Sequence, residues 1–90
     1  MSPPRYGVAV LTYNRRAEVL DTVARIASLV DEAAIVVVDN ASSDGTADAL
    51  AAAFPRVRVL RLPHNLGAAA RNEAARCIRA PYVAFADDDT

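Results

Sequence analysis

Apolar and polar positions divide the chain into seven segments that read alternately as strands and helices. Four runs rich in β-branched, leucine or aromatic residues predict strands, over residues 6–12, 34–38, 57–62 and 82–86. The segments between them carry apolar residues three and four apart or are rich in alanine, and they predict helices over residues 15–29, 46–54 and 68–78. Short polar connections join the seven elements, without linker, repeat or low-complexity segment. The expected order is β-α-β-α-β-α-β.

Helical crossovers between consecutive strands predict a parallel sheet in a Rossmann-like, three-layer α/β/α fold. The run AIVVV at residues 34–38 is apolar throughout, which is typical of a strand covered on both faces. Arginines alternate along the third strand and favour an edge position for it. Ligands of such sheets bind at the carboxyl ends of the strands, where the strand order reverses. Polar clusters follow three of the strands there, at residues 12–14, 39–40 and 87–89.

Composition narrows the classes of function. The chain has 90 residues, 53% of them hydrophobic, with a formal net charge of −1 and a mean hydropathy of +0.14. These values indicate a small soluble domain and argue against a disordered, membrane-embedded or nucleic-acid-binding chain. All ten basic residues are arginine, which excludes mechanisms that need a lysine. The single cysteine, Cys77, excludes an intramolecular disulfide and a multi-cysteine zinc site, and we expect it in the core.

Three aspartates, Asp87, Asp88 and Asp89, directly follow the last apolar strand. Like charges this close are unfavourable unless a cation or water compensates them. Strand alternation sends Asp87 and Asp89 to one side and Asp88 to the other. Two carboxylates on one side form part of an oxygen site for Mg²⁺ or Mn²⁺. A solvated acidic loop is the alternative, but the apolar strand before the triplet favours the metal.

Two further clusters suggest a nucleoside. Asp39 ends the second strand, where its carboxylate can accept hydrogen bonds from a nucleobase N–H or a ribose hydroxyl. We expect its neighbour Asn40 to close the strand with an Asx turn, and Asp44 or Thr46 to cap the next helix. After the first strand, Thr12 and Tyr13 form a turn. The ring of Tyr13 offers a flat face for stacking on a base, although an ordinary half-exposed tyrosine without a binding role is an equal alternative.

Arg71 lies about one turn into the third helix, on a face otherwise rich in alanine. A guanidinium there suggests an anionic partner, either a pyrophosphate or a nearby aspartate, whereas a surface arginine is the alternative. The loop residue His64 is given no role. The chain has no glycine-rich dinucleotide fingerprint, no phosphate-binding loop with its lysine and no nucleophile elbow. Dehydrogenases, P-loop enzymes and α/β-hydrolases are therefore disfavoured.

Four segments together resemble the nucleotide-binding half of family 2 glycosyltransferases of the GT-A fold. They are VAVLTYNR at residues 8–15, VVVDNASSDGT at 36–46, NLGAAARN at 65–72 and AFADDD at 84–89. Each motif alone would be weak evidence for the family, but the four in this order and spacing are specific. The resemblance covers essentially the whole chain. Leu11 departs from the family, in which proline is frequent at this position, and we expect only the turn to be affected.

The resemblance implies a role for each matching residue. Thr12 and Tyr13 would lie against the base, and Asp39 would hydrogen-bond the nucleoside. Arg71 would lie near the base or the diphosphate. Asp89 would be the principal ligand of Mg²⁺ or Mn²⁺ together with Asp87, and Asp87 and Asp88 would also contact the donor.

The resemblance implies a glycosyltransferase that moves a sugar from a UDP-, dTDP- or GDP-sugar to an acceptor hydroxyl, assisted by a divalent cation and with inversion. We expect residues 1–90 to hold the donor half of an incomplete GT-A fold, with the general base beyond Thr90 and no turnover by these residues alone. The alternatives are a non-catalytic nucleotide- or metal-binding α/β module and, less favoured, an aspartate-dependent phosphohydrolase. No secretory signal is visible, so we expect a cytoplasmic location, at the inner membrane face for a full-length enzyme. Self-association through an open sheet edge is a further expectation.

Overall fold

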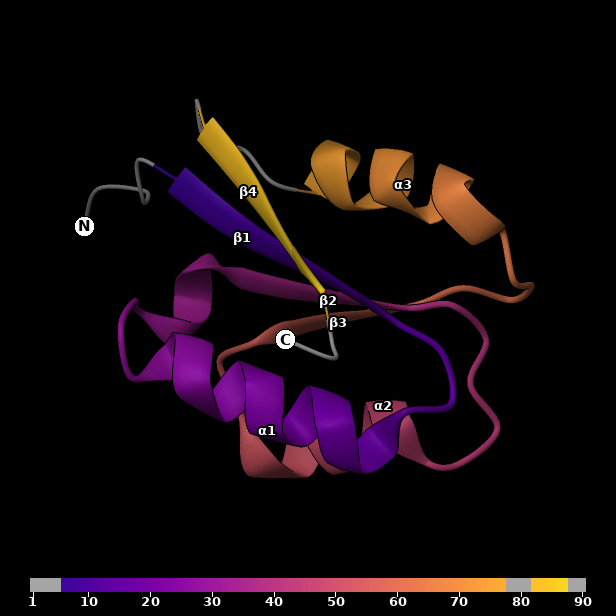
Figure 1. Ribbon diagram of the computed structural model, residues 1–90, viewed down its shortest axis with the longest axis horizontal. Helices are drawn as coiled ribbons and strands as arrows, with labels where there is room; N and C mark the ends of the chain where they lie inside the picture. Colours follow the sequence, from indigo (N-terminus) through magenta and orange to yellow (C-terminus); the bar gives the residue numbers. More distant parts are fainter. Residues whose placement is uncertain (1–5, 78–81, 88–90) are drawn as a thin grey trace.

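The computed structural model describes residues 6–77 and 82–87 of the chain. Strands and helices alternate in it as the sequence predicts, with two added 3₁₀ turns (Figure 1). The elements are β1 (Tyr6–Thr12), α1 (Arg16–Ala27), η1 (Glu32–Ala34), β2 (Ile35–Asp39), α2 (Thr46–Ala53), β3 (Arg58–Arg61), η2 (Gly67–Ala69), α3 (Ala70–Cys77) and β4 (Tyr82–Asp87).

The four strands form one parallel sheet in the order β3-β2-β1-β4 (Figure 1), which confirms the predicted parallel sheet. The chain builds outward from β1 through β2 to β3, and then places β4 on the other side of β1. The strand order therefore reverses between β1 and β4, the kind of position at which open parallel sheets bind ligands. Two register pairs define this edge: Thr12 of β1 pairs with Asp39 of β2, and Leu11 pairs with Asp87 of β4.

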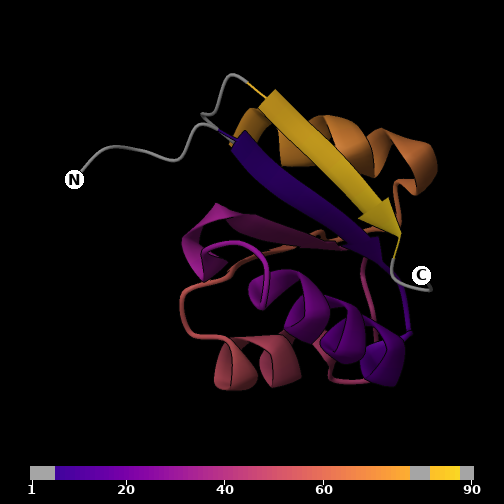
Figure 2. The same cartoon turned by 60° about the vertical axis from the view of Figure 1, so that its left-hand side comes forward.

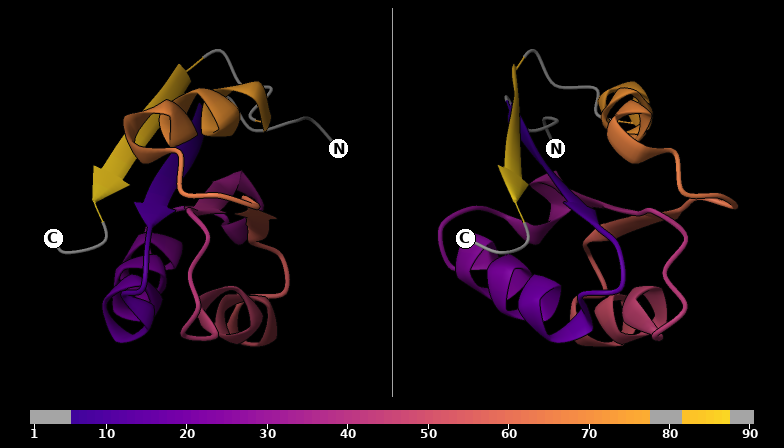
Figure 3. Two further views of the ribbon diagram at one scale, coloured as in Figure 1. Left: turned by 90° about the vertical axis from the view of Figure 1, so that its right-hand side faces the viewer. Right: turned by 45° about the vertical axis from the view of Figure 1, so that its right-hand side comes forward.

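Helices α1 and α2 cover one face of the sheet, and α3 covers the other (Figures 2 and 3). Strand β2 contributes to both layers: Val37 packs under α1 and α2, while Val36 and Val38 pack under α3. All five residues of β2 are buried, which confirms the expectation from its uninterrupted apolar run. Of the described helices, α1 is the longest, with 12 residues, and none is long and apolar enough to cross a membrane.

The ends of β2 differ slightly from the prediction. Ala34 belongs to the preceding 3₁₀ turn η1, which Asp31 caps by accepting a 2.9 Å hydrogen bond from the backbone N–H of Ala33. At the other end the strand continues through Asp39, because the carbonyl of Asp39 accepts a 2.9 Å hydrogen bond from the N–H of Leu62. Asp39 is therefore fixed on the strand rather than free in the loop that follows.

Strands β3 and β4 form the two edges of the described sheet. Arg58 and Arg61 of β3 are exposed, which confirms the edge position that the alternating arginines predict. Phe85 of β4 is 44% exposed, and no described strand pairs with the outer side of β4. Self-association through this edge stays a prediction.

Candidate functional site

The carboxyl ends of β1 and β2 bring two of the predicted site residues side by side. Thr12 and Asp39 are register partners and are only 3% and 4% exposed. Tyr13 follows Thr12 and is 48% exposed, so its ring is available to a ligand. Asp87 ends the neighbouring strand β4, whereas Asp88 and Asp89 lie outside the described residues.

The Thr12 hydroxyl is buried without a hydrogen-bond partner among the described residues. The backbone of Thr12 is satisfied, since its carbonyl accepts a 2.9 Å hydrogen bond from the N–H of Asn40. A buried hydroxyl left unpaired costs about 1–3 kcal/mol. An unpaired hydroxyl at the ligand-binding edge of a parallel sheet is therefore a group that a ligand would satisfy.

Asp39 forms the turn that the sequence reasoning assigned to Asn40. Its Oδ1 accepts a 3.2 Å hydrogen bond from the backbone N–H of Ser42, and the intervening Ala41 has a positive φ of 68°. The expectation of an Asx turn at Asn40 was wrong, because the side chain of Asn40 bonds Leu66 and Gly67 and the carboxylate of Asp39 makes the local bond instead. Asp39 therefore closes the end of β2, and it also lines a cavity between β3 and α2.

Asn40 instead joins β2 to the loop that leads into α3. Its Oδ1 accepts a 2.7 Å hydrogen bond from the N–H of Leu66, and its Nδ2 donates a 3.5 Å bond to the carbonyl of Gly67. Asn40 is 6% exposed. The sequence reasoning missed this contact, because it joins residues 26 and 27 positions apart.

The loops after β1 and β2 are tied to each other. The N–H of Asn14 donates a 2.8 Å hydrogen bond to the Ser42 hydroxyl, and Asn14 Oδ1 accepts a 2.8 Å bond from the N–H of Ser43. The N–H of Arg16 donates a 3.2 Å bond to Asp44 Oδ2. These contacts hold the loop of Tyr13 against the loop of Asp39.

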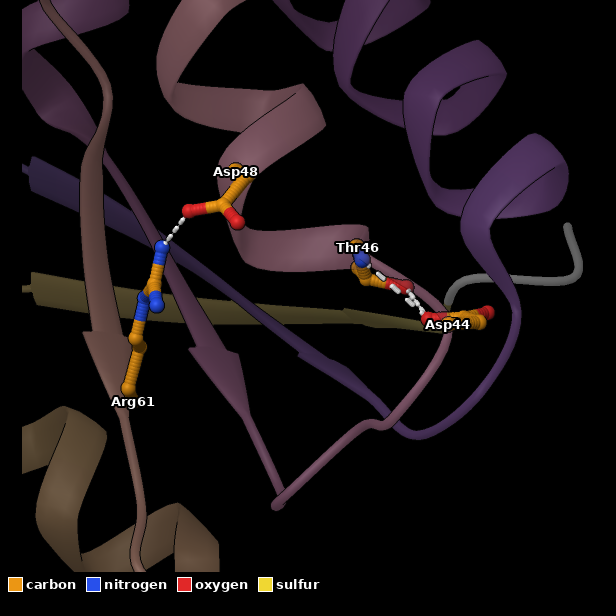
Figure 4. Close-up of polar contacts among 4 residues, drawn as sticks. All are labelled: Asp44, Thr46, Asp48 and Arg61. Atoms are coloured by element: carbon orange, nitrogen blue, oxygen red, sulfur yellow. Dashed lines mark hydrogen bonds and ion pairs between the residues drawn. The ribbon is translucent and has the colours of Figure 1, made fainter.

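Asp44 also bonds Thr46, the first residue of α2, whose N-cap is Gly45 (Figure 4). Its Oδ1 accepts a 3.1 Å hydrogen bond from the N–H of Thr46 and a second bond from the Thr46 hydroxyl. The residue between them, Gly45, has a φ of 81°, a conformation that glycine adopts without strain. The Thr46 hydroxyl is the main cause of a lowered pKa of the Asp44 carboxyl, and the N–H groups of Arg16 and Thr46 add to it.

We expect Asp44→Asn to make the stability of the fold less sensitive to acid. Because the pKa of Asp44 in the folded chain lies below its ordinary value of 3.8, ionised Asp44 stabilises the fold above that pH. The contribution is lost as the pH falls through the folded-state pKa. Thermal unfolding of both proteins between about pH 5 and pH 2 measures the difference.

Thr46→Val keeps the Asp44 carboxylate but removes its main donor, so its acid sensitivity should lie between those of the wild type and Asp44→Asn. Equal acid sensitivity in all three proteins would contradict a stabilising role for the bonds between Asp44 and Thr46.

A cavity of about 380 Å³ opens beside Asp39, between the end of β3 and the start of α2. Its polar lining comprises Asp39, Ser42, Ser43, Thr46, Asp48 and Arg61. Arg61 and Asp48 form an ion pair, which Figure 4 shows between β3 and α2. The Arg61 charge is therefore already compensated, and the lining offers a ligand mainly carboxylate and hydroxyl oxygens.

Arg71 lies on the opposite face of the sheet from Asp39. Val38 packs under α3, so Asp39, the next residue of the strand, faces α2, while Arg71 projects from α3. The Arg71 guanidinium carbon lies 5.4 Å from the ring centroid of Phe85 on β4, a cation–π contact. The anionic partner expected for Arg71 is not found among the described residues. Sequence reasoning had treated Phe85 only as a strand residue and missed this contact.

The metal prediction rests on the aspartates after β4. The described residues hold no group of three His, Cys, Asp or Glu side chains that could bind a metal ion. The backbone of Asp87 ends β4 beside Leu11, at the place where the strand order reverses. Carboxylate oxygens are the donors that Mg²⁺ and Mn²⁺ prefer, so the chemistry of the triplet fits such an ion.

The sequence model of glycosyl transferase family 2 matches residues 7–90. The chain belongs to this family. Two relatives, both validoxylamine A glucosyltransferases, are 36% identical over 91 residues; they come from Streptomyces hygroscopicus subsp. jinggangensis and subsp. limoneus. The match covers 93% of the chain, which thus spans about a fifth of the length of these relatives (22% and 20%).

Solved structures share the fold of this family 2 chain. The mannosyltransferase PcManGT from Pyrobaculum calidifontis, in complex with GDP-Man and Mn²⁺, is 30% identical, with a TM-score of 0.79 over 98% of the chain and 28% of its own length. S. aureus TarS (1–349) is 27% identical, with a TM-score of 0.72 over 96% of the chain and 28% of its own length. The GT-A type of fold expected from the sequence is confirmed for the described sheet and helices.

Proposed function

We propose that this family 2 chain binds the nucleoside diphosphate part of a nucleotide-sugar donor. In this proposal the protein transfers the sugar to an acceptor hydroxyl with inversion, and residues 1–90 form its donor-binding part. The observation that carries the proposal is the buried Thr12 hydroxyl, which has no hydrogen-bond partner among the described residues and lies beside the buried residue Asp39 at the carboxyl edge. The glucosyltransferase relatives and the mannosyltransferase holding GDP-Man and Mn²⁺ support it.

In this proposal each of the site residues has one role. The Thr12 hydroxyl donates a hydrogen bond to the nucleoside or accepts one from it, Asp39 accepts one, and the exposed Tyr13 ring stacks on the base. Arg71, exposed and without an ion-pair partner among the described residues, supplies positive charge near the diphosphate. The remaining donor contacts come from the aspartates after β4.

Asp87 and Asp89 would hold Mg²⁺ or Mn²⁺, and Asp88 would contact the donor. A divalent cation bound there would stabilise the negative charge that develops on the departing diphosphate. The carboxylates would position the diphosphate at the edge where the strand order reverses, next to the ends of β1 and β4.

Calorimetric titration of the chain with UDP, dTDP and GDP in Mn²⁺ tests this proposal. At least one nucleoside diphosphate should bind, more tightly than its nucleoside and more tightly in Mn²⁺ than in a chelator. Absence of binding by all three diphosphates would contradict it. If binding is found, assaying sugar transfer by the full-length protein separates the transferase from a non-catalytic nucleotide-binding module.

A further inference from the structure

We propose that Asn40 is a positioning residue of the donor site, which fixes the start of α3, and with it Arg71, relative to the ends of β1 and β2. The inference rests on the proposed donor-binding function for its significance, but the geometry is independent of that function. Asn40 acts through Arg71 and needs no contact with the donor.

Asn40 connects three parts of the carboxyl edge. Its backbone N–H donates a 2.9 Å hydrogen bond to the carbonyl of Thr12, which fixes it to the end of β1. It follows Asp39 directly and so continues β2. Its side-chain amide bonds Leu66 at 2.7 Å and Gly67 at 3.5 Å, in the loop before α3. One buried amide therefore links both site strands to the helix that carries Arg71.

Hydrogen bonds within residues 65–69 connect the position of Leu66, which Asn40 holds, to the start of α3. Gly67 has a φ of 57°, and its N–H donates a 2.8 Å hydrogen bond to the side chain of Asn65. The N–H of Ala69 then bonds the carbonyl of Leu66 at 3.2 Å. Arg71 is the second residue of the helix that follows, so a shift of Leu66 would move its side chain.

The packing of α3 makes such a restraint necessary. Among the residues of α3 whose burial the structure describes, those packed into the core beneath are alanines, Ala70 and Ala74. Short methyl groups interdigitate little with the strands beneath, so they resist sliding of the helix less than large side chains would. The directional hydrogen bonds of Asn40 provide the missing constraint, and under it the Arg71 guanidinium lies over Phe85.

The contact with Phe85 gives a readout that does not depend on any ligand. In the wild type, the aromatic ring current should shift the side-chain δ and ε protons of Arg71 upfield, and Phe85→Leu defines the unshifted position. We expect Asn40→Ala to remove most of this shift, while Asn72→Ala, a matched change at an exposed position of α3, should retain it. Methyl resonances of the core residues Val10 and Val37 report whether the fold is intact.

Retention of the full upfield shift in folded Asn40→Ala would overturn the proposal. If Asn40→Ala fails to fold, Asn40→Ser is measured in its place. The serine hydroxyl is too short to reach Leu66, but it keeps a polar group at this position. Loss of the shift in that variant supports the proposal, and its retention overturns it.

A double-mutant cycle with nucleoside diphosphate and Mn²⁺ distinguishes positioning from general destabilisation. Asn40→Ala should weaken binding about three- to tenfold, the range of one hydrogen bond. The same change should have little effect when Arg71 is already leucine, because the two residues act as one unit. Additive losses would overturn the link to Arg71. If the wild type binds no nucleotide, the proposed function fails, while the resonance of Arg71 still decides the role of Asn40.

Discussion

Replacing Asp89 with alanine is expected to abolish the Mn²⁺-dependent part of nucleoside diphosphate binding. In the proposed site this carboxylate is the principal ligand of the cation, and the cation in turn holds the diphosphate. Mutation of residues that do not touch a metal but hydrogen-bond its ligands costs about 10- to 100-fold in metal affinity. Loss of a ligand should cost about 100-fold or more in nucleotide affinity, measured by calorimetry in Mn²⁺.

The cation is tested by comparing the same proteins in a chelator. There, wild type and Asp89→Ala should bind the nucleotide equally weakly, because the variant lacks only the metal-mediated contribution. Asp21→Ala is a matched control: Asp21 is an exposed aspartate on α1, paired with Arg25 at 3.0 Å, and its loss should leave binding unchanged. If Asp89→Ala still bound the nucleotide more tightly in Mn²⁺ than in the chelator, Asp89 would not be the principal ligand of the metal.

The fold could be predicted from the sequence because its determinants are local. The uninterrupted apolar run of β2 indicates burial on both faces, and the arginines of β3 indicate an edge; both follow from the alternation of side chains along a strand. The strand order is less local and was not predicted, although helical crossovers between parallel strands leave few arrangements. Only the element ends shifted, by one or two residues at most positions.

The candidate site was less predictable because its contacts cross between loops. Asp39 rather than Asn40 makes the local turn, because the Asn40 amide bonds Leu66 and Gly67, which lie 26 and 27 positions along the chain. The contact of Arg71 with Phe85 depends on how α3 lies over β4, which local residue patterns do not specify. Sequence reasoning identified the chemical groups at the sheet edge but not the partners that orient them.

Thr12→Val is expected to stabilise the free chain while weakening nucleotide binding. Valine has nearly the shape of threonine, and it removes a buried hydroxyl that has no partner among the described residues. The free energy of unfolding should rise by about 1 kcal/mol, because an unsatisfied buried polar group is eliminated. Nucleoside diphosphate affinity should fall about five- to tenfold, the contribution of one hydrogen bond. Denaturant unfolding and calorimetry measure the two effects.

A hydroxyl that serves the ligand is distinguished from a structural one by this combination: its removal raises the stability of the free chain and lowers its affinity for the nucleotide. Thr46→Val makes the same chemical change at an equally buried position, but the Thr46 hydroxyl donates to Asp44, so this variant should lose stability. If Thr12→Val also lost stability, the Thr12 hydroxyl would have a partner within the protein, and its availability to a ligand would be disproved. If Thr12→Val gained stability without losing affinity, the nucleotide would bind away from the end of β1. Only a gain in stability together with a loss of affinity places the nucleoside against Thr12.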